Sequence, residues 1–314
     1  MKSVIRRVLR CGLLATAALA SLSAGPFPAA AVKPEGQASF ATPQACLSAL
    51  IEAAERDDTA ALLKIFGPKG KDIVRSGDDR EDKEKRAEFA RRARQKSRFI
   101  PDPADADKMI IAIGDEEWPM PVPLVRRDGR WRFLSAQGRQ EIMARRIGFN
   151  ELTAIEVCHG YVEAQYAFAQ AHRPKGVPEY ARKIVSSKGK QDGLFWEPAP
   201  GTPECDVPRA FAKAAASMSD SEKEPYFGYY FKELDGQGPS AHGGGMDYVV
   251  GGTMIGGFAL VAWPAKYGVS GVQTFIVDHD GVVYEKHLGP ETSRIVEKMT
   301  RFDPDKSWQR IKPD

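Results

Sequence analysis

Two Asp-Gly pairs constrain the fold of this chain more than any other feature. Asp128-Gly129 and Asp280-Gly281 each follow one run of β-branched or aromatic residues and precede another. Asp-Gly favours the tight turn of a β-hairpin, because both turn residues there need a positive φ angle. The pattern therefore predicts an antiparallel hairpin in each half of the chain. Together with the helical patterns described below, it predicts an α+β fold with two domains.

Residues 1–31 have the order of a secretory signal peptide. A basic start is followed by an apolar stretch from Cys11 to Ala24, and three alanines precede Val32. A membrane anchor is the alternative, but the apolar stretch is shorter than the ~18–20 residues that span a bilayer. We expect cleavage before Val32 and a mature protein that is periplasmic or secreted, with no transmembrane segment.

The charge balance argues against nucleic acid as a partner. The chain holds 45 Lys+Arg against 42 Asp+Glu, and residues 1–31 contain four of the bases and no acid. The mature chain then has 41 bases against 42 acids, a net charge of −1, which gives no global field for a polyanion. Hydrophobic residues at 42% and charged residues at 28% exclude wholesale disorder.

Three cysteines follow the leader, namely Cys46, Cys158 and Cys205. In an oxidising compartment one pair can form a disulfide and leave one thiol. All three pairings are open, and we favour Cys158–Cys205 because both residues lie in the second half. The sequence contains no Cys-x-x-Cys motif, so a thioredoxin-type or zinc-ribbon site has no support.

A polar linker over 32–40 precedes a first domain that we expect over 41–148. Thr42-Pro43 opens a helix, because threonine is a good N-cap and proline fits the first helical position. The charged segment 78–98 is expected to be helical, since its acids come first and its bases last, as the helix dipole favours. The other elements expected here are a helix over 58–66 and strands over 108–113, 119–125 and 130–134.

The run PVPLVRRDGRWRFL, placed after these helices, resembles the cone-shaped domain of nuclear-transport-factor-like (NTF2-like) proteins. The resemblance rests on layout, with helices followed by a curved antiparallel hairpin. It implies helices on a curved antiparallel sheet. Such cones often enclose a pocket, which Trp118, Trp131 and Phe133 would line here.

The second domain is expected over 149–314. Gly148 and Asn150 favour a break after a helix over 138–147, and a longer helix with an apolar stripe follows over 151–171. After a proline-rich segment the remainder is β-rich. The expected elements are a helix over 209–217, strands over 228–234, 246–250, 253–263, 273–277 and 282–286, and a last helix that opens at Pro290.

A long helix before an antiparallel sheet, carried by NELTAIEVCHGYVEAQYAFAQ and GVQTFIVDHDGVVYEK, resembles pilin and pseudopilin head domains. The resemblance implies that this helix packs on the sheet. The chain departs from that family because it lacks the N-terminal apolar half-helix that anchors a pilin and makes it polymerise.

Seven motifs occur in order along the mature chain: FATPQACLSALIEAA, IGDEEWPMPVPLV, WRFLSAQGRQEIMARRIGFNEL, GLFW, GYYF, GGFALVAWPAKYGVSGVQTFIV and MTRFDPDKSW. They resemble an exported bacterial family known only as domain of unknown function 2950 (DUF 2950). The resemblance covers nearly the whole mature chain. It implies an envelope protein without an assigned activity, and it carries over no catalytic residues.

Each candidate catalytic pair has a plainer structural explanation. Cys158-His159 are neighbours on an expected helix, so their side chains point about 100° apart and are poorly placed for a thiolate–imidazole pair. Ser187 and Lys190 match a serine–lysine spacing, but they lie in a glycine-flanked loop without the partner motifs of such enzymes. We therefore assign no catalytic residue.

Metal and cofactor motifs are incomplete in the same way. Asp278 and Asp280 suggest a calcium loop, yet the position where that loop needs glutamate is His287. His279 and His287 could bracket one hairpin, although two histidines make an incomplete zinc site. The glycine run 243–245 lacks the Gly-Lys-Ser/Thr of a phosphate loop. The sequence predicts no metal and no cofactor.

Aromatic residues crowd the second half and suggest a binding surface. Packing of most of these rings in the core of a glycine-rich sheet is the default interpretation. The functional alternative is a surface for a glycan or a protein, because exposed rings give a large contact area with a polar edge. The residues are Trp196, Tyr229, Tyr230, Trp263 and Tyr267.

Two functional hypotheses follow from these patterns. The leading one is a non-catalytic cell-envelope binding or scaffold protein, whose partner is another envelope protein or a cell-wall glycan. The alternative is a small-ligand carrier or an enzyme that uses a pocket in the cone-like first domain.

Overall fold

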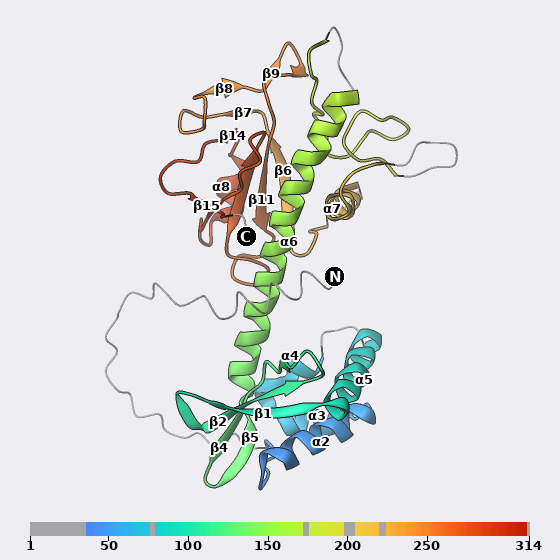
Figure 1. Ribbon diagram of the computed structural model, residues 1–314, viewed down its shortest axis with the longest axis vertical. Helices are drawn as coiled ribbons and strands as arrows, with labels where there is room; N and C mark the ends of the chain where they lie inside the picture. The colour runs from blue at the N-terminus through green and yellow to red at the C-terminus, as the bar shows by residue number, and fades with distance from the viewer. Residues whose placement is uncertain (1–35, 76–78, 172–175, 198–204, 220–223, 313–314) are drawn as a thin grey trace. The chain divides into compact units, whose positions relative to one another are not determined.

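The computed structural model describes residues 36–75, 79–171, 176–197, 205–219 and 224–312 (Figure 1). The signal peptide expected over residues 1–31 lies outside them. The chain divides into two compact units, Met1–Arg145 and Arg146–Asp314. Both units contain helices and antiparallel sheets, so the α+β class is confirmed.

The helices of the first unit begin where their capping residues predict. The hydroxyl of Thr42 accepts a hydrogen bond from the Ala45 N–H at 3.1 Å, and the carboxylate of Asp58 accepts one from Ala61 at 2.9 Å. Each cap satisfies an N–H group that has no partner inside the helix. The helices are α2 (Pro43–Glu55), α3 (Thr59–Phe66), α4 (Lys71–Val74) and α5 (Asp79–Gln95), with a 3₁₀ turn over Pro68–Gly70.

These helices pack on an antiparallel sheet with the strand order β1-β2-β4-β5, in which β3 pairs with β2. Its strands are β1 (Ser97–Asp102), β2 (Asp105–Ile113), β3 (Trp118–Pro119), β4 (Leu124–Arg127) and β5 (Arg130–Phe133). Asp128 and Gly129 have φ angles of 54° and 70° between the paired residues Arg127 and Arg130, so the first hairpin is confirmed. The NTF2-like cone stays a prediction.

The charged helix ends earlier than the sequence indicated. It was expected to run to residue 98, but α5 stops at Gln95, and Ser97 already pairs with Ile113 as the first residue of β1. The basic residues at the end of the charged segment are therefore divided between a helix and an edge strand.

The expected break at Gly148 and Asn150 is wrong, because α6 runs without interruption over Ser135–Ala171. The backbone space around Gly148 is open, so the missing side chain disturbs no packing. The side chain of Asn150 donates to the Ser270 carbonyl at 2.8 Å. It therefore does not compete for the hydrogen bonds of its own helix, which is how asparagine usually weakens one.

The second unit is built on a five-stranded antiparallel sheet with the order β15-β13-β12-β11-β6. Residues of α6 contact one face, where Tyr161 meets the β6 side chain Glu233, and α8 packs against β11 (Figure 1). The main strands are β6 (Tyr229–Leu234), β11 (Ala259–Pro264), β12 (Thr274–Asp278), β13 (Tyr284–Lys286) and β15 (Gln309–Arg310). A long helix on an antiparallel sheet is thus present in this unit.

Shorter elements complete the second unit. A three-stranded sheet has the order β14-β7-β8, and β9 and β10 form a small hairpin. The bounds are β7 (Gly236–Gln237), β8 (Met246–Asp247), β9 (Val249–Val250), β10 (Thr253–Met254), β14 (Arg301–Phe302), α7 (Arg209–Ser219) and α8 (Thr292–Glu297). Within the described ranges, we find no helix with both the length and the apolar character needed to cross a membrane.

Candidate functional site

The first unit contains an apolar cavity of about 230 Å³. Its deeper wall consists of buried side chains from several elements, and its edge consists of half-buried ones. The buried apolar residues are Leu50, Ala54, Leu62, Phe66, Val74, Met120 and Val122, and the half-buried ones are Ile73, Phe89, Trp118, Pro121 and Ile142. We call this space the apolar cavity.

The sequence of the helices explains why the cavity is apolar. Leu50 and Ala54 are one turn apart on α2, and Leu62 and Phe66 are one turn apart on α3. Residues spaced in this way share one face of a helix, so each helix presents two apolar side chains to the same space. An apolar wall built from several helices is what a site for a small organic molecule usually shows.

The charged side chains that border the apolar cavity all come from α5, and Asp82 among them is buried. Asp82, Lys85 and Arg86 of α5 are the ionisable residues that border it. The guanidinium of Arg86 is fixed, because it donates to the Asp57 carboxylate at 2.6 Å and to the Val74 carbonyl at 3.0 Å. The edge can therefore orient a polar group, while the interior accepts an apolar one.

Trp118 is the predicted pocket residue that the structure places at the apolar cavity. The guanidinium carbon of Arg145 lies 5.2 Å from the centre of its ring. Trp131 and Phe133 do not border the cavity and are buried in the core. The ring of Phe133 packs 5.1 Å from that of Phe66. The prediction for these two residues is corrected, because alternation along β5 turns both of them into the packed core.

The predicted aromatic surface is not a single surface. Tyr229 is buried, and its hydroxyl donates to the Gln273 carbonyl at 2.8 Å, so its assignment as an exposed binding residue is corrected. Tyr230 and Trp263 are half-buried partners on adjacent strands, with ring centres 5.7 Å apart. Neighbouring residues of a strand point to opposite faces, which is why Tyr229 enters the core and Tyr230 does not.

The remaining two aromatic residues have other partners. The ring of Tyr267 stacks on His287 with the centres 5.3 Å apart, and its hydroxyl lies 2.5 Å from the histidine Nε2. Trp196 is half-buried beside the isolated bridge of Val185 and Phe195. The structure therefore brings together one predicted pair, Tyr230 and Trp263.

The expected relation of Cys158 and His159 holds in the structure. Cys158 is fully buried, and burial raises the pKa of its thiol to about 12, whereas His159 is exposed. All three described cysteines are free thiols, and the Sγ of Cys205 donates to the Leu194 carbonyl at 3.3 Å. The Cys158–Cys205 disulfide is not formed in this structure and stays a prediction.

Ser187 does meet a lysine, but the lysine is Lys183. The Nζ of Lys183 lies 2.8 Å from the Ser187 hydroxyl and 2.7 Å from the Asp192 carboxylate. The hydrogen bonds that the Lys183 Nζ and the Ser187 N–H donate to this carboxylate hold the pKa of Asp192 well below its usual range. A lysine must be a neutral amine to accept a proton from serine. The Lys183 Nζ is hydrogen-bonded to the Asp192 carboxylate, so the three residues serve as a loop clamp.

The aspartates of the second hairpin act as turn residues. The carboxylate of Asp278 is buried and accepts a hydrogen bond from the Asp280 N–H at 3.1 Å. His279 lies against Tyr248, whereas His287 lies against Tyr267. Among the described residues, no group of three or more histidine, cysteine or carboxylate side chains is placed to hold a metal ion.

Sequence reasoning missed Glu233, a half-buried acid of β6 that faces α6. Glu233 faces Tyr161 and Gln165, and burial raises the pKa of its carboxyl to about 8. Its signal in the sequence is weak. Tyr161 and Gln165 are four residues apart and therefore share one face of the helix. In the strand, however, a glutamate next to Leu234 is equally typical of an exposed position.

A family model matches residues 37–311, and its description reads "Protein of unknown function (DUF2950)". The chain belongs to the DUF2950 family. The match spans both units of this DUF2950 chain. Neither a curated protein nor a solved structure matches it. The function of this family member has to be argued from its own geometry.

Proposed function

We propose that this chain is a binding protein of the cell envelope, and that the apolar cavity of its first unit holds a small molecule. The cavity carries the proposal, because its lining is apolar apart from three charged residues that all come from α5. Export rests on the basic, apolar and small-residue order of residues 1–31.

The size and lining of the cavity define the ligand class. A volume of about 230 Å³ is below the ~300–1,000 Å³ of sites for drug-sized molecules. Trp118 and Phe89 offer ring faces, and Met120 offers a side chain that adapts to irregular shapes. A compact molecule with an aromatic or branched apolar body and one polar group fits this environment.

Blocking the cavity tests the proposal. Ile142 borders the cavity, and its neighbour Met143 on α6 is exposed and does not. Ile142→Trp should fill the space and weaken binding of the neutral dye 1-naphthylamine by about ten-fold or more, the equivalent of ~1.4 kcal/mol. Met143→Trp adds the same ring outside and should leave the affinity unchanged.

The measurement is the blue shift of dye emission on titration with the full chain, with circular dichroism to show that both variants fold. Equal affinity of the two folded variants for the dye would contradict the proposal. So would a wild-type chain that leaves the dye emission unshifted at millimolar protein.

A second candidate function is supported by the contact of Tyr230 and Trp263. Two half-buried rings side by side on a sheet resemble the stacking platforms on which sugars and protein side chains dock. We expect Trp263→Ala to reduce retention of the protein on insoluble cell-wall material, and Trp196→Ala to leave retention unchanged. Equal retention of both variants would count against this platform.

A further inference from the structure

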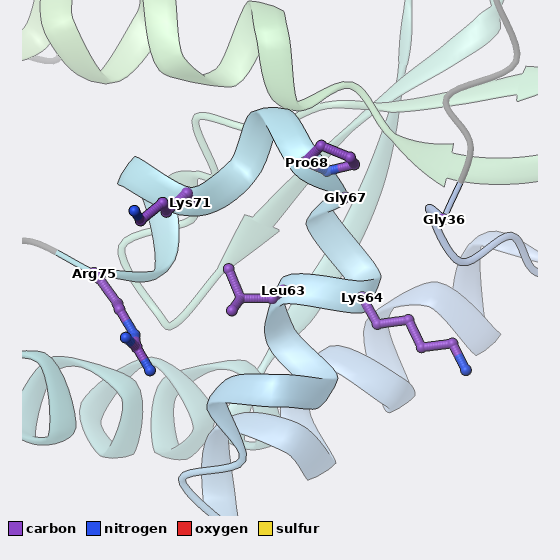
Figure 2. Close-up of a pocket in the computed structure, with 7 residues that line it drawn as sticks. All are labelled: Gly36, Leu63, Lys64, Gly67, Pro68, Lys71 and Arg75. Atoms are coloured by element: carbon purple, nitrogen blue, oxygen red, sulfur yellow. The ribbon is translucent and has the colours of Figure 1, made fainter.

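The first unit has a second depression, and its described ionisable residues are all basic. It has a volume of about 420 Å³ and is bordered by α3, by the 3₁₀ turn and α4, and by Gly36 (Figure 2). Its cationic side chains are Lys64, Lys71 and Arg75, and none of the described residues that line it is acidic. We call it the basic hollow.

The three cations of the basic hollow have no ion-pair partner among the described residues. All three are exposed, and within the part of the chain that the structure describes none of them forms an ion pair. Other arginines of this unit are paired, as Arg94 is with Glu55 at 2.8 Å. The nearby carboxylate of Asp72 is directed to Arg139, 3.4 Å away.

Uncompensated charges around a concave surface concentrate a positive potential there. Repulsion between the three side chains is a cost that a bound anion would remove. The chain as a whole is close to neutral without its leader, so this potential is local. It favours a small anion bound at one place over a polyanion spread across the surface.

The arrangement of the side chains indicates the kind of anion. Figure 2 shows Lys64, Lys71 and Arg75 extending from different points around Leu63 instead of meeting at one point. Side chains that do not converge favour an anion with several charged groups over a single phosphate group. An anion with several charges along its length could meet more than one end, and the apolar residues Leu63 and Pro68 also line the hollow.

The backbone around the basic hollow is held in place. The side-chain amide of Gln37 donates to the carbonyls of Ile65 and Phe133, at 3.1 and 2.8 Å. Gly67 adopts a φ angle of +70°, and a Cβ there would lie 2.9 Å from the Gln37 Cβ. The glycine therefore lets the segment at residue 37 approach α3 closely, which closes one side of the hollow.

We propose that the basic hollow binds a small multivalent anion of the phosphate class, in which two or more phosphate groups are linked in a chain. This site is separate from the apolar cavity and does not depend on the function proposed for it. Lysine and arginine are the side chains that recognise phosphate oxygens, lysine as a point charge and arginine as a fork.

Inorganic tripolyphosphate and orthophosphate are the probes that test the proposal, titrated into the full chain by isothermal calorimetry at low salt. We expect tripolyphosphate to bind about ten-fold or more tightly than orthophosphate, because it reaches more than one cation. Its affinity should fall as salt rises, as for any site that releases counterions. Equal affinity for the two probes would overturn the multivalent assignment.

Variants identify the site. Lys64→Gln, Lys71→Gln and Arg75→Gln should each weaken tripolyphosphate binding by about three- to ten-fold. Lys83→Gln removes an exposed lysine of α5 outside the hollow and should have little effect. Ile142→Trp, which fills the apolar cavity, should also bind tripolyphosphate normally, so failure of the two proposals can be told apart.

Two results would overturn the site. One is an equal loss of affinity in Lys83→Gln and in the hollow variants, which would show general charge attraction. The other is binding to vesicles of anionic phospholipid without any binding of tripolyphosphate, which would assign the cations to a membrane surface.

Discussion

The carboxyl oxygen Oε1 of Glu233 on β6 lies 3.2 Å from the hydroxyl of Tyr161 on α6. Gln165, one turn further along α6, also donates to this oxygen at 3.4 Å. Burial raises the pKa of Glu233 to about 8, whereas an unfolded chain gives a glutamate pKa of about 4.3. The folded protein therefore holds a proton that the unfolded chain releases over this interval.

This difference predicts the sign of a pH effect on stability. The contribution of Glu233 is fully present below about pH 4 and is lost as the pH rises through 8, because the folded state binds the extra proton. Glu233→Gln keeps the accepting oxygen and removes the titration. The variant should be more stable than the wild type at pH 9 by about 1–4 kcal/mol, since one pKa unit is worth ~1.4 kcal/mol.

Urea unfolding at pH 5 and pH 9 measures this effect. Glu291→Gln is the control, because Glu291 is an exposed partner of Arg294. Glu233→Gln and wild-type curves that keep the same separation at both pH values would contradict the assignment of a neutral, half-buried acid.

Two glycines of α6 should respond in opposite ways to alanine. Gly148 has open space around its Cα, so Gly148→Ala should stabilise the chain by about 0.5–1 kcal/mol through its better helix propensity. Gly138 lies against Val122, where a Cβ would be 2.6 Å from a side-chain methyl, so Gly138→Ala should destabilise it. Thermal unfolding followed by circular dichroism measures the stability of both variants. A fall in melting temperature for Gly148→Ala would argue for a broken helix at this point.

Alanine variants of two glycines with positive φ angles allow the stability cost of backbone strain to be distinguished from that of steric crowding. Gly189 has a φ of +74° and open surroundings, so Gly189→Ala should cost about 1–2 kcal/mol. Gly228 has a φ of +72°, and a Cβ would lie 2.5 Å from that of Ser270. Gly228→Ala should therefore cost about 1–3 kcal/mol more. Chemical denaturation that ranks the two variants equally would contradict the close approach at Ser270.

The thiols should differ in reactivity. Burial raises the pKa values of Cys46 and Cys158 to about 12, and Cys205 is only half-buried. A thiol reagent at pH 8 should label Cys205 first in the folded protein, because the thiolate is the reactive form. Peptide mapping after short exposure identifies the labelled residue. If Cys158 and Cys205 instead stay unlabelled after unfolding without reductant, the disulfide favoured from the sequence is present in the exported protein.

Local signals predicted the local structure well. Thr42 and Asp58 mark the starts of α2 and α3 because an N-cap acts within three residues. Asp128-Gly129 marks a hairpin because the φ angles of two residues decide the turn. The family assignment was predicted as well, since the motifs extend over both units.

Features that depend on distant residues could not be predicted in this way. Asn150 fits inside α6 because its amide reaches Ser270, far along the chain. Tyr229 is buried because of its register opposite Pro264, which no local pattern sets. The residues of the apolar cavity are scattered from Leu50 to Ile142 and form no motif. Those of the basic hollow, apart from Gly36, lie within 63–75, but no local pattern shows that they surround one depression.

The two hollows of the first unit share a wall. On α3, Leu62 and Phe66 border the apolar cavity, while the adjacent Leu63 and Lys64 border the basic hollow. Successive residues of one short helix therefore serve two different linings. Inserting one residue into α3 would turn both sets of side chains by about 100°. Such an insertion should damage both sites together, whereas Lys64→Gln changes the lining of only one of them.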